Sequence, residues 1–215
     1  MVVRGMRLAV SRFWYLLYKT TAAPPGIGAT ADVTLRLATQ KDRASFGMLA
    51  YRRGLDELFA WLEEDDTWLF VAVAQGHAIA YDCVSWRLPS KPPFRDLALA
   101  RDEVWVRDVY TAPEFRRLRV NRALRAYRNA ALREIGVRGT LSAVSEDNVA
   151  SLVATYDATV SRVEGLAYRR VLFHRRVRHH GDARARLEQV VGAARATAPA
   201  LEPAAWTRGL AVLDR

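Results

Sequence analysis

This sequence of 215 residues holds little cysteine, little lysine and no long apolar run. Cys83 is its only cysteine, so an intramolecular disulfide is impossible and no metal site is expected. No stretch approaches the roughly eighteen uninterrupted apolar residues of a membrane-spanning helix, because arginine and aspartate recur throughout. These absences predict a globular, cytoplasmic chain, with peripheral contact to a membrane as the remaining option.

The charge is strongly one-sided. The only lysines are Lys19, Lys41 and Lys91, so that 30 of the 33 basic residues are arginines, and the formal net charge is +10. Such an excess favours anionic partners, which include nucleic acid, a membrane surface and a phosphate-bearing cofactor. Charge alone does not choose among them, and abundant arginine can also follow from a genome rich in G and C.

Residues 4–19 read RGMRLAVSRFWYLLYK, four basic residues around an apolar run dense in aromatic side chains. The pattern predicts a short amphipathic helix, which a flexible connector follows. Such a helix could lie on an anionic membrane with Trp14, Tyr15 and Tyr18 at headgroup level, or pack on the body of the protein or on a second subunit. Peripheral membrane contact and a homodimer are therefore both expectations for this segment.

From residue 33 onward, strand and helix patterns follow one another. The patterns predict a strand at 33–39, helical structure over 39–64, a hairpin over 67–88, a loop over 89–101, a strand at 103–111, a helix over 115–136, a strand at 138–145, a helix over 146–158 and a strand over 164–177. This order predicts an α/β (α+β) fold, with a central mixed, mostly antiparallel sheet of about six strands flanked by helices.

The segment APEFRRLRVNRALRAYRNAALREIG, residues 112–136, begins as an anion-binding turn begins. A helix N-terminus presents unpaired N–H groups and about half a positive charge, which suits a phosphate. The strand before it, EVWVRDVYT, alternates strictly enough to predict Val106 and Asp108 on one face, with Arg107 and Val109 on the other. The sequence therefore predicts an anion site where this strand passes into the helix.

Residues 33–177, and most clearly 103–174, resemble the GNAT superfamily of acyl-CoA-dependent N-acetyltransferases. In that family a hydrophobic strand is followed by Val-x-Pro, an acidic and an aromatic residue, then Arg-x-x-Gly-x-Gly and a helix. The residues that keep this order here are Pro113, Glu114, Phe115, Arg116 and the helix leucine Leu124. The later segment NVASLVATYDATV resembles the family's Asn-x-x-Ala/Ser helix through Asn148 and Ser151.

The resemblance implies that acetyl-CoA, or another acyl-CoA, binds as co-substrate. The implied contacts are Val109, Tyr110, Thr111, Arg116, Arg117, Leu118, Arg119, Val120, Asn121, Arg122, Asn148 and Ser151. The family's two glycine positions fall on Arg119 and Asn121, where Cβ atoms would narrow the approach of a pyrophosphate. Because asparagine tolerates a left-handed conformation and the arginines add charged donors, we still expect this turn to bind an anion.

The resemblance also implies that a substrate amine attacks the acyl thioester, which calls for a base and an acid. Asp108 is the candidate base, directly or through water, and Glu103 at the start of the same strand is the alternative. The family's tyrosine usually follows the helix asparagine by seven residues, where this chain has Thr155, and Tyr156 projects about 100° further round a helix. Tyr156 is therefore either the catalytic acid or a packing residue.

The predicted organisation is an amphipathic segment and linker over 1–30, a GNAT-like domain over 31–180 and a helical appendage over 181–215. The leading function is transfer of an acetyl or other acyl group from CoA to an amine of a small molecule. The alternative is a catalytically degenerate module that binds nucleic acid, a membrane or a protein through its basic surface. Nucleic acid is the less expected partner, because the sequence indicates no aromatic-lined strand face and no base-reading motif.

Overall fold

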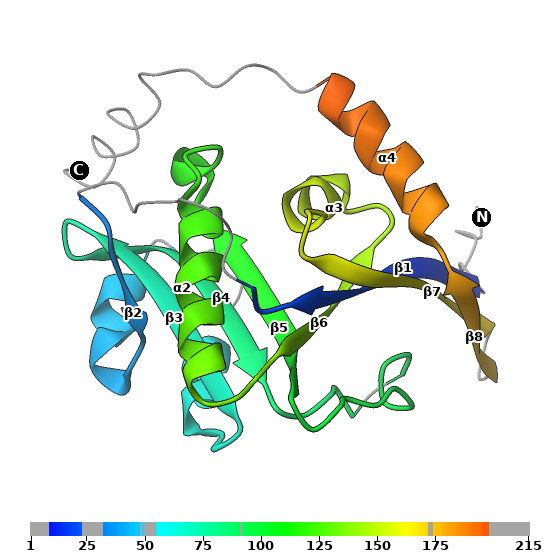
Figure 1. Cartoon of the computed structure of the whole chain (residues 1–215). Coiled ribbons are helices and arrows are strands. Elements are labelled where there is room, and N and C mark those ends of the chain that lie inside the picture. Colours follow the sequence, from blue (N-terminus) through cyan, green and yellow to red (C-terminus); the bar gives the residue numbers. More distant parts are fainter. Residues whose placement is uncertain are drawn as a thin grey trace, which may run out of the picture. The chain divides into compact units, whose positions relative to one another are not determined.

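The computed structural model describes residues 9–22, 32–47, 49, 55–90, 92–171 and 174–197. Contacts between backbone positions divide the chain into two compact units. We call them the α2 unit, which holds the described residues of 21–87 and 99–140, and the α4 unit, which holds those of 1–20, 88–98 and 141–198. Figure 1 shows their strands and helices.

The α2 unit is built on four strands in the order β2-β3-β4-β5, and each neighbouring pair is antiparallel. The strands are β2 (Thr34–Leu37), β3 (Thr67–Ala74), β4 (His77–Ser85) and β5 (Glu103–Thr111). The hairpin between β3 and β4 turns at Gln75 and Gly76, where φ is 47° and 80°. Positive φ at both central positions is what a tight hairpin turn requires, so the predicted turn is confirmed.

Helix α2 (Val120–Glu134) lies against β3 and β4 (Figure 1). Its apolar residues recur at helical spacing, and Val120, Leu124 and Leu132 are buried in the core of the unit. The chain leaves the helix at Gly136, whose φ of 88° suits a residue without a Cβ. The short helices of this unit are η1 (Gln40–Phe46), α1 (Leu55–Ala60), η3 (Trp61–Glu63) and η4 (Pro113–Phe115).

The α4 unit has the strand order β6-β1-β7-β8. Its strands are β6 (Gly139–Ser145), whose first two residues belong to the α2 unit, β1 (Ala9–Thr20), β7 (Val160–Val171) and β8 (His174–Asp182). Helices α3 (Val149–Thr155) and α4 (Arg184–Ala196) complete the unit. Tyr15 and Leu17 of β1 share its core with Leu152 of α3 and with Leu187 and Val191 of α4.

The helix predicted over residues 4–19 is wrong, because Ala9–Thr20 forms β1 and pairs with β7 along its length. Tyr15, Leu16 and Leu17 are all fully buried, so both faces of this strand are covered. A strand buried on both faces has a continuous apolar run, which periodicity does not separate from a buried helix. Tyr15 and Tyr18 are also buried and therefore do not lie at a membrane surface, and residues 4–8 lie outside the described residues.

The single strand predicted over 164–177 is also wrong, since this stretch contributes to two antiparallel strands, β7 and β8. Within the predicted helical appendage over 181–215, α4 is helical from Arg184 to Ala196, and residues 198–215 lie outside the described part. Eight strands are described where about six were expected, and the predicted class, a mostly antiparallel sheet with flanking helices, is confirmed. No helix among the described residues is long and apolar enough to cross a membrane.

Candidate functional site

Strand β5 carries a β-bulge beside Asp108. Cys83 of β4 pairs with Asp108 and Val84 pairs with Val106, so Arg107 has no partner in the ladder. Because Cys83 and Val84 point to opposite faces, Val106 and Asp108 do as well, and the strict alternation predicted for this strand is wrong. The bulge turns Asp108 toward the face that Cys83 occupies.

The side chains of Arg107 and Asp108, at the bulge, both contact neighbouring residues. The Arg107 guanidinium lies over the Trp61 ring, 4.3 Å from its centroid, and forms an ion pair with Glu64 whose hydrogen bonds lower the pKa of that carboxyl group. On Asp108, the hydroxyl of Tyr81 donates a 2.7 Å hydrogen bond to Oδ2. Asp108 is half-buried, while Tyr81 is fully buried. The carboxylate is thus oriented by a rigid neighbour.

Beyond Asp108, the predicted cofactor residues Val109, Tyr110 and Thr111 form the end of β5. The Tyr110 ring stacks on Tyr81, with 5.9 Å between their centroids. The Thr111 carbonyl accepts a 3.2 Å hydrogen bond from Arg116 Nε, whereas the buried Thr111 hydroxyl has no partner. A buried hydroxyl without a partner is uncommon, and here it lies at the entrance to the predicted anion-binding turn.

The turn between η4 and α2 has the backbone geometry of a glycine-rich turn without its glycines. Arg117 and Arg119 have φ values of 67° and 63°, and Arg119, with ψ of 7°, is the left-handed N-cap of α2. Arg119 occupies one of the two glycine positions of the family motif. Asn121, at the other glycine position, does not use the left-handed conformation that asparagine tolerates: it is helical, and its Oδ1 accepts a hydrogen bond from Arg125 at 3.0 Å. Arg117 and Arg119 therefore adopt a left-handed backbone conformation that is unfavourable for a residue with a Cβ atom.

Six consecutive amides of this turn have no acceptor. Within the described residues, none of the backbone N–H groups from Arg117 to Arg122 donates a hydrogen bond, and the ladder of α2 begins with Ala123 N to Arg119 O at 3.0 Å. No side chain caps the helix. The side chains of Arg116, Arg117, Arg119 and Arg122 are all exposed around these amides. The arrangement offers an anion backbone donors, a helix N-terminus and mobile positive charge.

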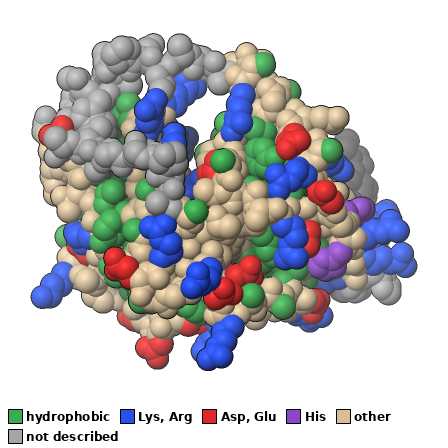
Figure 2. Space-filling model, viewed as in Figure 1, with side chains coloured by type: hydrophobic (Ala, Val, Ile, Leu, Met, Phe, Trp, Pro, Cys, Tyr) green, Lys and Arg blue, Asp and Glu red, His purple; other side chains and the backbone are tan. Residues whose placement is uncertain are grey.

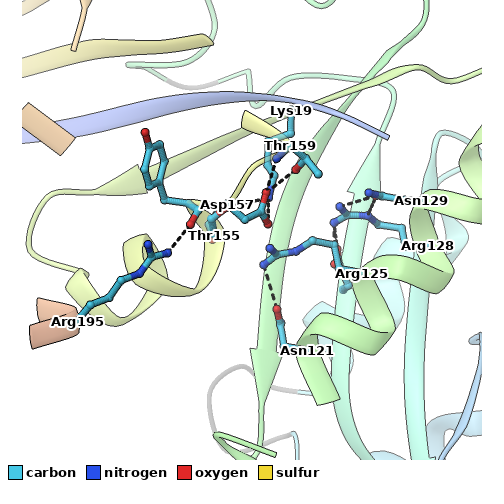
Figure 3. Close-up of polar contacts among 11 residues, drawn as sticks. Lys19, Asn121, Arg125, Arg128, Asn129, Thr155, Asp157, Thr159 and Arg195 are labelled. Atoms are coloured by element: carbon cyan, nitrogen blue, oxygen red, sulfur yellow. Dashed lines mark hydrogen bonds and ion pairs between the residues drawn. The ribbon is translucent and has the colours of Figure 1, made fainter. Parts of the chain in front are cut away.

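Helix α2 is fixed to the sheet by a buried ion pair that the sequence analysis does not anticipate. Arg128 Nη1 donates to both carboxylate oxygens of Asp82, at 2.8 and 2.7 Å, and its Nε and Nη2 donate to Asn129 Oδ1 (Figure 3). The side chains of Arg128 and Asp82 are 2% and 0% exposed. Two features of the sequence point to this pair: Arg128 lies on the apolar face of a predicted helix, and Asp82 lies inside an apolar strand.

The predicted residues of the second segment lie at the start and the end of α3, in the α4 unit. Asn148 is the N-cap of α3, and its Oδ1 accepts a 3.2 Å hydrogen bond from the amide of Ser151. At the other end, the hydroxyl of half-buried Tyr156 donates to Glu188 Oε1 at 2.5 Å. Burial first and this hydrogen bond second raise the pKa of Tyr156.

The turn after α3 is fixed by Lys19 of β1. The Lys19 ammonium is 3% exposed and donates to the Thr155 carbonyl and to Asp157 Oδ2, both at 2.8 Å (Figure 3). Burial alone would raise the pKa of Asp157, but the hydrogen bonds from Lys19 and Thr159 lower it to about 2. Sequence reasoning misses this pair because its partners are 138 residues apart.

The structure thus brings Asp108 to Arg122 together within the α2 unit, whereas Asn148, Ser151 and Tyr156 belong to the α4 unit. No protein-family model matches the chain, and neither does any curated protein. The predicted site residues thus fall into two groups, one in each unit.

Solved structures do resemble the chain. A functionally unknown conserved protein from Staphylococcus epidermidis aligns with a TM-score of 0.54 and 11% identity, over 76% of this chain and 63% of that one. Aminoglycoside N-acetyltransferase AAC(6')-Iy in complex with CoA aligns with a TM-score of 0.46 and 21% identity, over 59% and 92% of the two chains. The ribosomal-protein-S18-alanine N-acetyltransferase from Escherichia coli aligns with a TM-score of 0.45 and 13% identity, over 66% and 96%. The likeness to the Staphylococcus epidermidis protein shows that the two chains share a fold.

Proposed function

We propose that this chain is an acyl-CoA-dependent N-acyltransferase that transfers an acetyl or other acyl group to an amine of a small molecule. The observation that carries the proposal is the run of six amides, Arg117 to Arg122, which find no acceptor in the described residues and open onto an uncapped helix. A protein rarely leaves so many donors together without a ligand or solvent to accept from them. The diphosphate of CoA is an anion of the right chemistry for such a turn.

The residues of the turn fit a pyrophosphate in two respects. Arg119 keeps the left-handed backbone that a glycine would adopt, so the conformation of the turn is retained although the glycine is absent. The exposed arginines add charge-assisted donors beside the backbone N–H groups. When bound, acyl-CoA supplies a thioester that an amine can attack. The amides of 117–122 would hold its phosphates, with Val109, Tyr110 and Thr111 beside them.

Asp108 is the proposed base. An acceptor amine is protonated at neutral pH and must lose a proton before it attacks, and a half-buried carboxylate held by Tyr81 is oriented to accept that proton, directly or through water. Glu103, the alternative, has its Oε2 occupied by a 3.0 Å hydrogen bond from the Ala100 amide. Each candidate therefore has one carboxylate oxygen in a hydrogen bond, and Asp108 is preferred because it is adjacent to the proposed cofactor residues Val109 to Thr111.

The residue that would protonate the departing thiolate has less support from the geometry than the base has. The family resemblance implies Tyr156 as the acid, because a phenol is far more acidic than the neighbouring threonine hydroxyl. The alternative is a packing role, in which the hydroxyl of Tyr156 serves only its contact with Glu188. The same resemblance implies cofactor contacts at Asn148 and Ser151, where the Asn148 side chain already caps α3.

A thermal-shift titration with CoA tests the proposal. A ligand that binds only the folded protein raises the melting temperature, so CoA is expected to raise it progressively with concentration. The absence of any shift at millimolar CoA, in protein shown to be folded, would contradict the proposal.

Two double variants sharpen this test at the former glycine positions. Arg119→Gly with Asn121→Gly removes both Cβ atoms, and Arg119→Ala with Asn121→Ala removes the side chains but keeps the Cβ atoms. If Cβ atoms narrow the site, the glycine pair binds CoA more tightly than the alanine pair and than the wild type. If both pairs bind CoA equally weakly, the arginine and asparagine side chains are themselves ligands.

A further inference from the structure

Three strands of the α4 unit present a defined row of side chains on one face. In the register of β1, β7 and β8, Arg12 pairs with Tyr168 and Tyr168 with Val177, while Trp14 pairs with Leu166. Residues that pair across strands share a face, and alternate residues along each strand return to it. We call this the basic face, and its described side chains near the outer strand are Arg12, Trp14, Tyr168, Arg170, Arg175, Val177 and His179.

The opposite face of the same strands is covered. Phe13, Tyr15 and Leu17 of β1 point to that side and pack with Leu187 and Val191 of α4. The basic face therefore points away from the helices of its unit. Arg12, Arg170, Arg175 and His179 are exposed on it, and Trp14 and Tyr168 are half-buried.

The hairpin of β7 and β8 carries an excess of positive charge. No aspartate or glutamate occurs between residues 165 and 181. Two pairs of arginines stand directly opposite each other across β7 and β8, Arg169 with Arg176 and Arg170 with Arg175. Within the described residues, Arg12, Arg169, Arg175, Arg176 and Arg178 form no ion pair or hydrogen bond. Figure 2 shows basic and histidine side chains gathered at the end of the molecule where Figure 1 places β8.

Like charges opposite each other on a sheet destabilise it, and among the described residues Arg169 and Arg176 have no ion pair that would offset this cost. A polyanion would offset it. The charge thus indicates a partner with regularly spaced phosphates rather than a single small anion.

Aromatic rings lie among these arginines. The Trp14 ring lies 6.3 Å from the Tyr168 ring at a tilt of 60°, and 5.5 Å from the Phe94 ring, edge to face. Across the β1–β7 pair, Arg12 lies directly opposite Tyr168. Along β7 on the same face, Tyr168 lies between Arg170 and Leu166, and Leu166 is opposite Trp14. Half-exposed aromatic rings set between arginines on a strand face are the combination that holds single-stranded nucleic acid, because bases stack on the rings while arginines contact phosphates.

We propose that the basic face binds single-stranded nucleic acid. The half-buried rings lie within a sheet surface, where they can stack on bases, and they do not project as a membrane-inserting side chain would. The sequence predicts no such face, because it predicts a helix where β1 lies. None of the residues of the basic face belongs to the proposed acyl-transfer site, so the two proposals can be tested separately.

The test is fluorescence-anisotropy titration of the full chain with a labelled oligouridylate of about a dozen nucleotides, within the footprint of such sites. Binding should weaken as salt rises, with a slope of about −0.7 in log–log units for each phosphate that is neutralised. The Arg12→Gln, Arg175→Gln double variant should therefore flatten the slope by about 1.4. The matched control is Arg133→Gln with Arg138→Gln, which removes the same charge from two exposed arginines of the α2 unit and should leave binding close to wild type.

A ring variant separates stacking from charge. Tyr168→Leu should lower affinity for the oligouridylate about tenfold, whereas Tyr168→Phe, which keeps the ring, should not. Equal losses in the two arginine pairs, or no loss in Tyr168→Leu, would overturn the proposal, as would absence of binding at low salt. Binding to anionic phosphatidylglycerol vesicles without binding to the oligouridylate would also overturn it, in favour of a membrane contact.

Discussion

Helices α2 and α3 both begin at positions that the family resemblance assigns to CoA, and they begin differently. Helix α3 is closed by its own sequence, since Asn148 accepts a hydrogen bond from the amide of Ser151. Helix α2 is left open, because left-handed Arg119 makes no capping bond with its side chain and the amides from Arg117 to Arg122 find no acceptor among the described residues. A capped start needs no ligand, whereas an open start in a basic turn leaves donors for an anion or for water.

The same contrast extends to the residues around each helix. Near α3, Lys19, Asp157, Tyr156 and Glu188 satisfy one another. Near α2, the Thr111 hydroxyl is unpartnered and Asp108 is only half-buried. We therefore expect substitutions near α2 to change catalysis and CoA binding with little effect on stability, and substitutions near α3 to change stability with little effect on catalysis.

The largest effect is expected at Asp108. Asp108→Asn keeps the shape and the contact with Tyr81 but removes the base, so turnover should fall about a hundredfold or more, with CoA affinity and melting temperature close to wild type. Asp102→Asn is the matched control, because Asp102 is an exposed carboxylate in the turn before β5. A pH–rate profile that is the same in Asp108→Asn and wild type would eliminate Asp108 as the base.

The next largest effect is on stability, at Lys19. Lys19→Met leaves the Thr155 carbonyl and Asp157 without their donor, which should lower the free energy of unfolding by about 2 kcal/mol, while Lys41→Met on the surface should change little. Chemical denaturation at neutral pH measures the difference. A loss of CoA binding in Lys19→Met, with stability retained, would reverse the roles assigned to the two regions.

The pH dependence of this stability has a defined direction. The pKa of Asp157 is lowered from 3.8 to about 2 in the folded chain, so its contribution is present above 3.8 and is lost as pH falls toward about 2. The stability gap between wild type and Lys19→Met should therefore narrow over that window, to the part that the Thr155 carbonyl contributes. A gap that stays constant down to pH 2 would show that Asp157 is not the partner that matters.

Local patterns predicted the parts of the fold that local physics decides. The β3–β4 hairpin followed from Gly76 between two apolar runs, and the end of α2 from Gly136. Strand β1 could not be predicted, because burial on both faces removes the alternation that identifies a strand. The split of the last strand into β7 and β8 is a local hairpin in which Val171 pairs with His174, but residues 171–174 include no glycine, proline, asparagine or aspartate that would predict a turn.

In the candidate site, too, the local features were predictable from the sequence and the contacts between distant residues were not. The turn and its anion-binding character followed from the motif order, yet the left-handed residues are Arg117 and Arg119, and not Asn121. The contacts of Arg128 with Asp82 and of Lys19 with Asp157 join residues 46 and 138 positions apart. No local window contains both partners, so only the folded chain reveals them.

A smaller effect is expected at the cap of α3. Asn148→Ala should cost about 1 kcal/mol, the usual size for the loss of a capping side chain, and should leave CoA affinity unchanged. Arg119→Ala is the counterpart at α2, where no capping bond is lost and stability should hold. Weaker CoA binding in Asn148→Ala than in Arg119→Ala would instead support the cofactor contact that the resemblance implies for Asn148.

The smallest effect is expected at Tyr156. If the hydroxyl serves only the contact with Glu188, which is exposed, Tyr156→Phe should cost under about 1 kcal/mol and leave turnover unchanged, and Thr155→Val should be equally silent in rate. In a double-mutant cycle with Glu188→Ala, the coupling should account for most of the stability change. The packing role is favoured because burial and Glu188 both raise the pKa of this phenol, which makes it a weaker proton donor. A collapse in the rate of Tyr156→Phe at an unchanged melting temperature would show that Tyr156 is the acid, and would place a catalytic group in the region that otherwise serves only stability.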